Sequence, residues 1–396
     1  MTSLAAPTRR MPALERAREG RGISRAEALL LMESCELDAL LEAAAAIRDQ
    51  SKGRKVSFSK KVFIPLTHLC RDYCGYCTFR SDPLLGAPAY MSPEEVLAAA
   101  EAGRKAGCKE ALFSLGDQPE RVFPEARDFL RRFGCETTLE YLAAMSELVL
   151  KETGLLPHSN PGVMGEADLC RLKESNISMG LMLEVTSTRL LGTGLAHWQA
   201  PDKAPAVRLR TIRDAGKQRV ACTTGILVGI GERFEDRVDS LFAIRHLHEE
   251  YGHIQEVIVQ PFRAKAGTRM AASIEPSMEE LLRTLAFARL ILGPEMNLQS
   301  PPNLVSEEFP RLLEAGINDW GGISPVTKDF INPEAAWPEV PVLAAGTVAA
   351  GFTLRERLAI YPEFSARPEF VGAWLRGPLA ILQADDGYAR AEGPAC

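Results

Sequence analysis

The chain has 396 residues, of which 46% are hydrophobic and 25% are charged, and its formal net charge is −6. These proportions are typical of a globular protein, and the acidic balance argues against a nucleic acid as the main partner. No apolar run approaches the roughly 20 residues that cross a bilayer, and the N-terminus lacks the apolar segment of a secretory signal. We therefore expect a cytoplasmic protein with no membrane partner.

The first predicted elements are helices within residues 20–50. Ser24 stands where it can cap the first of them, and apolar residues recur at helical spacing over residues 40–47. We assign residues 1–55 to an N-terminal helical extension.

From residue 62 onward, short apolar runs alternate with longer amphipathic helical segments, which is the pattern of a parallel sheet with crossover helices. Eight such runs are found, at residues 62–66, 110–115, 155–159, 177–185, 220–228, 256–262, 297–299 and 317–321. Eight units over about 260 residues match a (β/α)8 TIM barrel. We predict an α/β barrel over residues 56–330. A six-unit partial barrel is the alternative, because the last two runs are the weakest.

The remaining residues, 331–396, are predicted to form a C-terminal extension that packs on the barrel. Prolines at positions 333, 338 and 341 interrupt its first part, and residues 354–358 have the composition of a helix.

Three cysteines follow the first apolar run in a C-x3-C-x2-C spacing: Cys70, Cys74 and Cys77. Three thiolates on one tight loop can ligate three corners of a 4Fe–4S cluster, which leaves one iron open to a ligand. A structural zinc site wants four protein ligands, and only His68 is available nearby as a fourth. A zinc-binding regulatory or scaffold protein is therefore the alternative of a different class.

The other six cysteines are scattered and do not form a disulfide framework. We assign them no function, although Cys135 or Cys170 is considered as a fourth cluster ligand. They are Cys35, Cys108, Cys135, Cys170, Cys222 and Cys396.

Several groups at the ends of the predicted strands suit a ligand, since the active site of a barrel lies at the C-terminal ends of its strands. Gly116 and Asp117 follow the second run; they form either a close backbone approach to a ligand or an ordinary turn. Glu184 interrupts the fourth run, where a buried carboxylate needs either a ligand hydroxyl pair or a basic side chain. The fifth run ends in a glycine-rich segment that suits a flat adenine; it lacks the Lys-Ser or Lys-Thr of a phosphate loop.

Polar side chains at the other strand ends are candidates for binding a substrate, with capping or turn formation as the alternative for each. They are His158, Asn160, Gln260, Gln299, Asn303, Asn318 and Asp319.

The cysteine spacing, with Tyr76 before the third cysteine, resembles the radical S-adenosylmethionine (SAM) enzymes. The segments 115–117 and 225–232 are similar to the amino-group and adenine-binding motifs of that superfamily. More narrowly, five segments resemble the CofG subunit family of 7,8-didemethyl-8-hydroxy-5-deazariboflavin (FO) synthases, and together the likeness covers roughly residues 60–365. They are residues 63–67, 70–79, 115–120, 157–162 and 201–208. His68 is a departure, because the family has Asn there.

The resemblance implies one 4Fe–4S cluster held by the three cysteines, with SAM bound to its open iron and cleaved to a 5′-deoxyadenosyl radical. It implies that Gly116 and Asp117 hold the SAM amino group, that Arg208 holds the carboxylate and that Glu184 holds the ribose. Tyr76 would shield the cluster or stack on the adenine. The adenine would lie against Gly229, Ile230 and Gly231.

The resemblance also implies the reaction. The radical would abstract hydrogen from a tyrosine-derived hydroxybenzyl adduct of a ribitylaminouracil, and ring closure with loss of ammonia would make the chain a lyase of coenzyme F-420 biosynthesis. A CofH-type partner would make the adduct, and an electron donor would reduce the cluster. A radical SAM enzyme of another subfamily, biotin-synthase-like or hydrogenase-maturation-like, is the alternative.

Overall fold

The computed structural model describes residues 12–391, and nine parallel strands form its central sheet. The strand order is β2-β3-β4-β5-β6-β7-β8-β1-β9, and a further pairing of β1 with β2 closes the first eight strands into a barrel. The predicted eight-stranded barrel is confirmed, and the six-unit alternative is not. The strands are β1 (Lys55–Thr67), β2 (Glu110–Leu115), β3 (Leu156–Asn160), β4 (Ser178–Gly180), β5 (Cys222–Val228), β6 (Ile254–Pro261), β7 (Leu298–Gln299), β8 (Asp319–Ile323) and β9 (Thr353–Arg357).

Strand β1 closes the barrel because it is long enough to pair with three neighbouring strands. Its second half pairs with β2, beginning at Lys61 opposite Glu110, while its first half pairs with β8 and β9.

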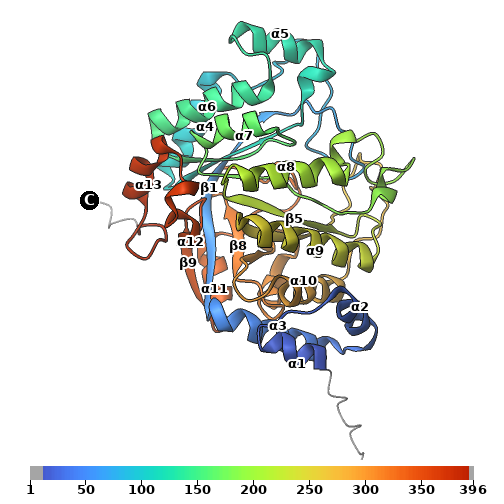
Figure 1. The fold of residues 1–396 in the computed structure, drawn as a ribbon. Coiled ribbons are helices and arrows are strands. Elements are labelled where there is room, and N and C mark those ends of the chain that lie inside the picture. The colour runs from blue at the N-terminus through green and yellow to red at the C-terminus, as the bar shows by residue number, and fades with distance from the viewer. Residues whose placement is uncertain (1–11, 392–396) are drawn as a thin grey trace, which may run out of the picture.

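Helices surround the barrel (Figure 1). Ser24 caps α2 as predicted, and Ser92 caps α4; each forms a reciprocal capping box with a glutamate three residues further on. The helices are α1 (Pro12–Arg18), α2 (Arg25–Ser34), α3 (Leu37–Ser51), α4 (Pro93–Lys105), α5 (Pro124–Arg132), α6 (Thr138–Thr153), α7 (Glu166–Lys173), α8 (Pro205–Lys217), α9 (Phe234–Tyr251), α10 (Met278–Leu292), α11 (Val340–Ala349), α12 (Pro362–Ser365) and α13 (Arg376–Leu382). No helix within residues 12–391 is long and apolar enough to cross a membrane.

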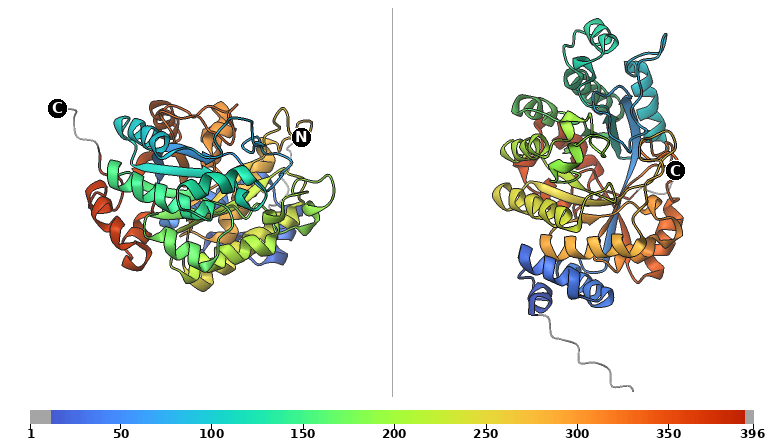
Figure 2. Two further views of the ribbon diagram at one scale, coloured as in Figure 1. Left: turned by 90° about the horizontal axis from the view of Figure 1, so that it is seen from above. Right: turned by 90° about the vertical axis from the view of Figure 1, so that its right-hand side faces the viewer.

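The N-terminal helices pack beneath the barrel helices α9 and α10, as both views show (Figures 1 and 2). The C-terminal segment adds β9 to β1, and the residues after β9 pack against Leu156, Ile177 and Ala221 at the N-terminal end of the barrel.

The helix predicted at residues 354–358 is wrong, because this segment is strand β9. Leu, Arg and Glu favour a helix locally, but Arg357 has two partners inside the barrel. Its guanidinium donates to Asp319 at 2.7 and 3.0 Å and to Glu256 at 2.9 Å. These contacts require an extended chain beside β1, so tertiary structure overrides the local propensity.

Alternate residues of each strand point into the barrel, as the two-residue period of a strand requires. Many of the inward side chains are polar rather than the branched apolar residues that usually fill a TIM barrel. They include Lys61 of β1, Glu110 of β2, His158 and Asn160 of β3, Glu256 and Gln260 of β6, and Gln299 of β7.

Candidate active site

The cysteine loop, residues 70–77, leaves the C-terminal end of β1 and is held by two other loops. The Gly75 amide donates to the Ala196 carbonyl at 2.7 Å, and the Gly75 carbonyl accepts from the Met270 amide at 3.0 Å. Arg269 donates to the Tyr73 carbonyl at 2.6 Å. These bonds fix the backbone of the loop at the mouth of the barrel.

The three cysteines of this loop are free thiols at least partly withdrawn from solvent. Burial raises the pKa of Cys70 to about 12 and also raises that of Cys74, so iron binding must displace their protons. The loop itself supplies three thiolates, whereas a structural zinc site wants four protein ligands.

His68 is occupied in supporting the cysteine loop. Its Nδ1 hydrogen-bonds the Phe79 carbonyl at 2.8 Å, and its ring packs on the Phe79 ring at 4.4 Å. The imidazole thus joins the two ends of the loop, and the departure from Asn leaves the loop supported. Cys170, on α7, instead donates to Gln218; Cys135 follows α5, and Cys396 lies outside the described residues.

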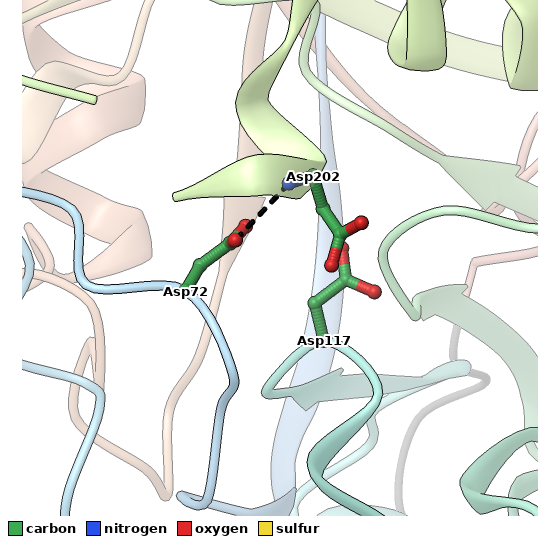
Figure 3. A group of neighbouring side chains, drawn as sticks. All are labelled: Asp72, Asp117 and Asp202. Atoms are coloured by element: carbon green, nitrogen blue, oxygen red, sulfur yellow. Dashed lines mark hydrogen bonds between the residues drawn. The ribbon is translucent and has the colours of Figure 1, made fainter. Parts of the chain in front are cut away.

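Three buried carboxylates, those of Asp72, Asp117 and Asp202, meet beside the cysteine loop (Figure 3). One oxygen from each lies within 4.8 Å of the others. Burial, together with the charges of Asp202 and Asp72, raises the pKa of Asp117 to about 7. Burial also raises the pKa of the other two carboxyl groups. An acidic cluster of this kind is complementary to a ligand ammonium group.

Gly116 and Asp117 lie directly against the first cysteine. The Asp117 amide donates to Cys70 Sγ at 3.2 Å, and the Asp117 carboxylate accepts from the Val163 amide at 3.1 Å. A Cβ on Gly116 would lie 1.9 Å from the Leu69 carbonyl oxygen. Glycine is therefore required for the end of β2 to pack on the cysteine loop.

Glu184 and Arg208 are buried charged side chains close enough to interact electrostatically. Glu184 has a positive φ of 66°, a strained conformation for a residue other than glycine, and Lys203 donates to its carboxylate at 2.5 Å. Burial alone would raise the pKa of Glu184, but Lys203 and Arg208 hold it below its ordinary value. Arg208 donates to the Met182 carbonyl at 2.7 Å, while its buried Nε has no hydrogen-bond partner. An orphaned guanidinium N–H fits a ligand carboxylate.

Glu232 fixes the backbone of the glycine-rich segment after β5. Its carboxylate accepts from the amides of Gly229 and Ile230, both at 2.8 Å, and it pairs with Arg237 at 2.6 Å. Gly229 and Gly231 have φ angles of 96° and 95°, so the turn depends on glycine. Tyr76 lies opposite and hydrogen-bonds His197 at 3.2 Å.

The candidate substrate residues divide into two groups. His158, Asn160, Gln260 and Gln299 line one cavity inside the barrel. Asn303, in contrast, is bound to Asp329 and to the Ala335 carbonyl. The side chain of Asn318 bonds Arg289, the Leu298 amide and Asn297 below the barrel, and Asp319 pairs with Arg357.

The cluster and cavity contain residues that we did not assign from the sequence. Asp72 and Asp202 stand in segments that carry the family resemblance, so those segments offered a clue to them. Lys61, Glu110 and Trp337 stand in unremarkable sequence, and only the closed barrel brings them together.

Comparisons with known proteins agree with the family resemblance seen in the sequence. A family model of the radical SAM superfamily matches residues 64–244. The 7,8-didemethyl-8-hydroxy-5-deazariboflavin synthase of Methanopyrus kandleri is 49% identical over 335 residues, which covers 85% of this chain and 100% of that relative. The FO synthase of Streptomyces coelicolor is 49% identical over 395 residues, which covers 96% of this chain and 45% of that relative. The chain thus spans about half the length of the FO synthases that it matches.

Solved structures share the fold. The hydrogenase maturase HydG aligns with a TM-score of 0.71 at 16% identity, covering 87% of this chain and 75% of that one. Methylornithine synthase (PylB) aligns with a TM-score of 0.67 at 20% identity, covering 86% and 97%.

Proposed function

Because the chain belongs to the 7,8-didemethyl-8-hydroxy-5-deazariboflavin synthase family of radical SAM proteins, we propose that it closes the deazaflavin ring of that product. The substrate is a tyrosine-derived hydroxybenzyl adduct of a ribitylaminouracil, and the reaction is a lyase reaction that releases ammonia. The observation that carries the proposal is the meeting of the cysteine loop and the buried acidic cluster above a polar cavity in the barrel.

The residues present fit the cofactors that this function requires. A 4Fe–4S cluster on Cys70, Cys74 and Cys77, with SAM on its open iron, supplies a 5′-deoxyadenosyl radical, chemistry that no side chain supplies. The orphaned Arg208 Nε is supportive evidence, since a SAM carboxylate would satisfy it. Asp117 and the Gly116 backbone receive the amino group.

The remaining SAM contacts follow from the two neighbouring loops. Glu184 binds the ribose hydroxyls while Lys203 neutralises its charge. The backbone of Gly229, Ile230 and Gly231 lies against the adenine, and Tyr76 shields the cluster from solvent. By covering the cluster these residues keep water away from reactive species.

On the substrate side, His158, Asn160, Gln260 and Gln299 orient the adduct within the cavity. Asn303 and Asn318 are omitted, because their side chains are bound elsewhere. Burial lowers the pKa of His158 to about 4, so it acts as a neutral hydrogen-bonding group. A CofH-type partner supplies the adduct, and an external donor supplies the electron.

The test is 5′-deoxyadenosine release by the reconstituted chain under anaerobic reducing conditions. We expect release to rise when the hydroxybenzyl adduct is added, together with formation of a fluorescent deazaflavin. Release that is indifferent to the adduct, with no deazaflavin formed, would assign the chain to another radical SAM reaction.

A further inference from the structure

A cavity of about 150 Å³ lies inside the barrel and combines apolar and charged walls. The rings of Phe63 and Trp337 stack on one side at 5.4 Å with an interplanar angle of 25°. Lys61 and Glu110 lie on the same wall, one on each of two adjoining strands. Placing charged groups inside a barrel is costly unless they have partners, so this wall requires an explanation.

Glycines on the neighbouring strands make room for the polar side chains. A Cβ on Gly322 of β8 would lie 1.0 Å from Lys61 Cε, and a Cβ on Gly180 of β4 would lie 2.0 Å from Asn160 Oδ1. Any other residue at Gly322 would push Lys61 out of its present position. The backbone is therefore shaped to admit an ammonium group into the barrel.

Glu110 has room on its carboxylate for a further donor. The residue is only 2% exposed, and its Oε1 lies 3.3 Å from Lys61 Nζ. The Ser59 hydroxyl interacts with the carboxylate, and no other described side chain or amide donates to Oε2. A carboxylate oxygen has two lone pairs, so a ligand N–H can bind Oε2 beside Ser59.

The other ionic groups of the cavity are already matched. Arg357 pairs with Asp319 and Glu256, and His158 is bound to Ser178 at 2.6 Å. Although burial opposes it, Lys61, Arg357 and the hydrogen bond with Ser59 hold the pKa of Glu110 below its ordinary value. Glu110 is thus ionised beside a cation, and its Oε2 can accept one further donor.

We propose that Lys61 and Glu110 bind the pyrimidinedione edge of the substrate. Glu110 Oε2 accepts the ring imide N–H, and Lys61 donates to the adjoining ring carbonyl. An imide presents a donor and an acceptor side by side, which is the complement of a carboxylate next to an ammonium; a flexible ribityl chain has no such fixed pair. Phe63, two residues beyond Lys61 on the same face of β1, offers the ring an apolar surface. This inference rests on the proposed function.

The test is the binding of a ribitylaminouracil to the reconstituted full chain, measured by calorimetry. We expect Glu110→Gln and Lys61→Met each to weaken binding about ten- to a hundredfold, the range for a hydrogen bond to a charged group. Glu356→Gln is the matched control, because Glu356 pairs with Lys109 at 2.7 Å and does not line the cavity. Binding to this variant is expected to equal that of the unmodified chain.

An analogue methylated on the imide nitrogen keeps the test decisive if a variant fails to fold. The unmodified chain is expected to bind this analogue about ten- to a hundredfold more weakly than the parent compound. Glu110→Gln is expected to bind the analogue no more weakly than the unmodified chain does, because the methyl group and the substitution remove the same hydrogen bond. Equal binding of both compounds would overturn the inference. It would also be overturned if free ribitol competed with the ligand for the unmodified chain but not for Glu110→Gln, because Glu110 would then bind the ribityl chain. If the unmodified chain releases 5′-deoxyadenosine in response to the adduct but Glu110→Gln binds the ribitylaminouracil normally, only this inference fails. If the unmodified chain shows no adduct-dependent release, the proposed function fails.

Discussion

Arg208 shows how one buried side chain is prepared for a ligand. It is 4% exposed, and one of its nitrogens is held by the Met182 carbonyl while Nε has no partner. We predict that Arg208→Lys raises the dissociation constant of SAM about tenfold or more, because lysine cannot make both contacts from one planar group. Equilibrium dialysis with the reconstituted chain measures it.

The matched control is Arg210→Lys, which alters an exposed arginine two residues further along α8. We expect unchanged SAM binding in that variant, and unchanged iron content in both. Wild-type affinity in Arg208→Lys would remove Arg208 from the site.

Three buried histidines make stability depend on pH. Burial lowers the pKa of His158 to about 4, of His197 to about 3 and of His253 to about 4. In the unfolded chain a histidine binds a proton near pH 6.5, so between pH 6.5 and 4 these three side chains bind more protons in the unfolded state than in the folded state. Their contribution to stability is therefore full above pH 6.5 and falls as the pH drops through this window.

We predict that lowering the pH from 7.5 to 5 reduces the melting temperature less, or raises it more, in His253→Gln than in the unmodified chain. The contribution of His253 is at most roughly 3 kcal/mol, at about 1.4 kcal/mol per pKa unit. An equal change in both proteins would show that the His253 imidazole does not resist protonation.

At the scale of elements, the cysteine loop depends on the close approach of the end of β2. We predict that Gly116→Ala sharply lowers the iron bound per chain, since the new Cβ would lie 1.9 Å from the Leu69 carbonyl oxygen. Gly377→Ala is the control, because its Cβ would meet nothing within 4 Å. Full iron incorporation by Gly116→Ala, with an unchanged circular dichroism spectrum, would contradict the tight packing described here.

Strand β9 closes the floor of the barrel through Arg357. Arg357→Met leaves Asp319 and Glu256 buried without their cation, and we expect a loss of about 3–5 kcal/mol in the free energy of unfolding. Arg355→Met breaks an exposed pair with Asp386 and a cation–π contact with the Tyr388 ring at 5.7 Å, and it should cost no more than about 1–2 kcal/mol. Denaturant unfolding compares the two variants. Equal losses in the free energy of unfolding would show that the buried ion pairs of Arg357 stabilise the fold no more than an exposed pair does.

These elements also show what the sequence predicts well. Apolar runs flanked by helix caps identified all eight barrel strands, because burial on both faces leaves a local pattern. β9 left no such pattern: Arg357 reaches partners 38 and 101 residues away. Local secondary-structure propensity cannot predict contacts between residues so far apart in the sequence.

At the scale of the whole molecule, the barrel gathers residues from distant segments into one site. The spacing of Cys70, Cys74 and Cys77 could be interpreted from the sequence because three ligands on one loop are a local signature. The acidic cluster and the Lys61–Glu110 wall could not, since each depends on which strands become neighbours on closure. Asn318 illustrates the converse: it lies in the predicted run 317–321, but the structure places it just before β8, at the N-terminal end of that strand and away from the cavity.

The central claim is that the cysteine loop holds a 4Fe–4S cluster with one iron open to SAM. Electron paramagnetic resonance of the reduced, reconstituted chain, recorded with and without SAM, tests it most directly. We predict a cubane signal that SAM alters in the unmodified chain and in Cys222→Ala, a buried cysteine of β5 outside the loop, and no such signal in Cys74→Ala. A signal that SAM leaves unchanged, or a colourless chain that holds zinc, would contradict the account.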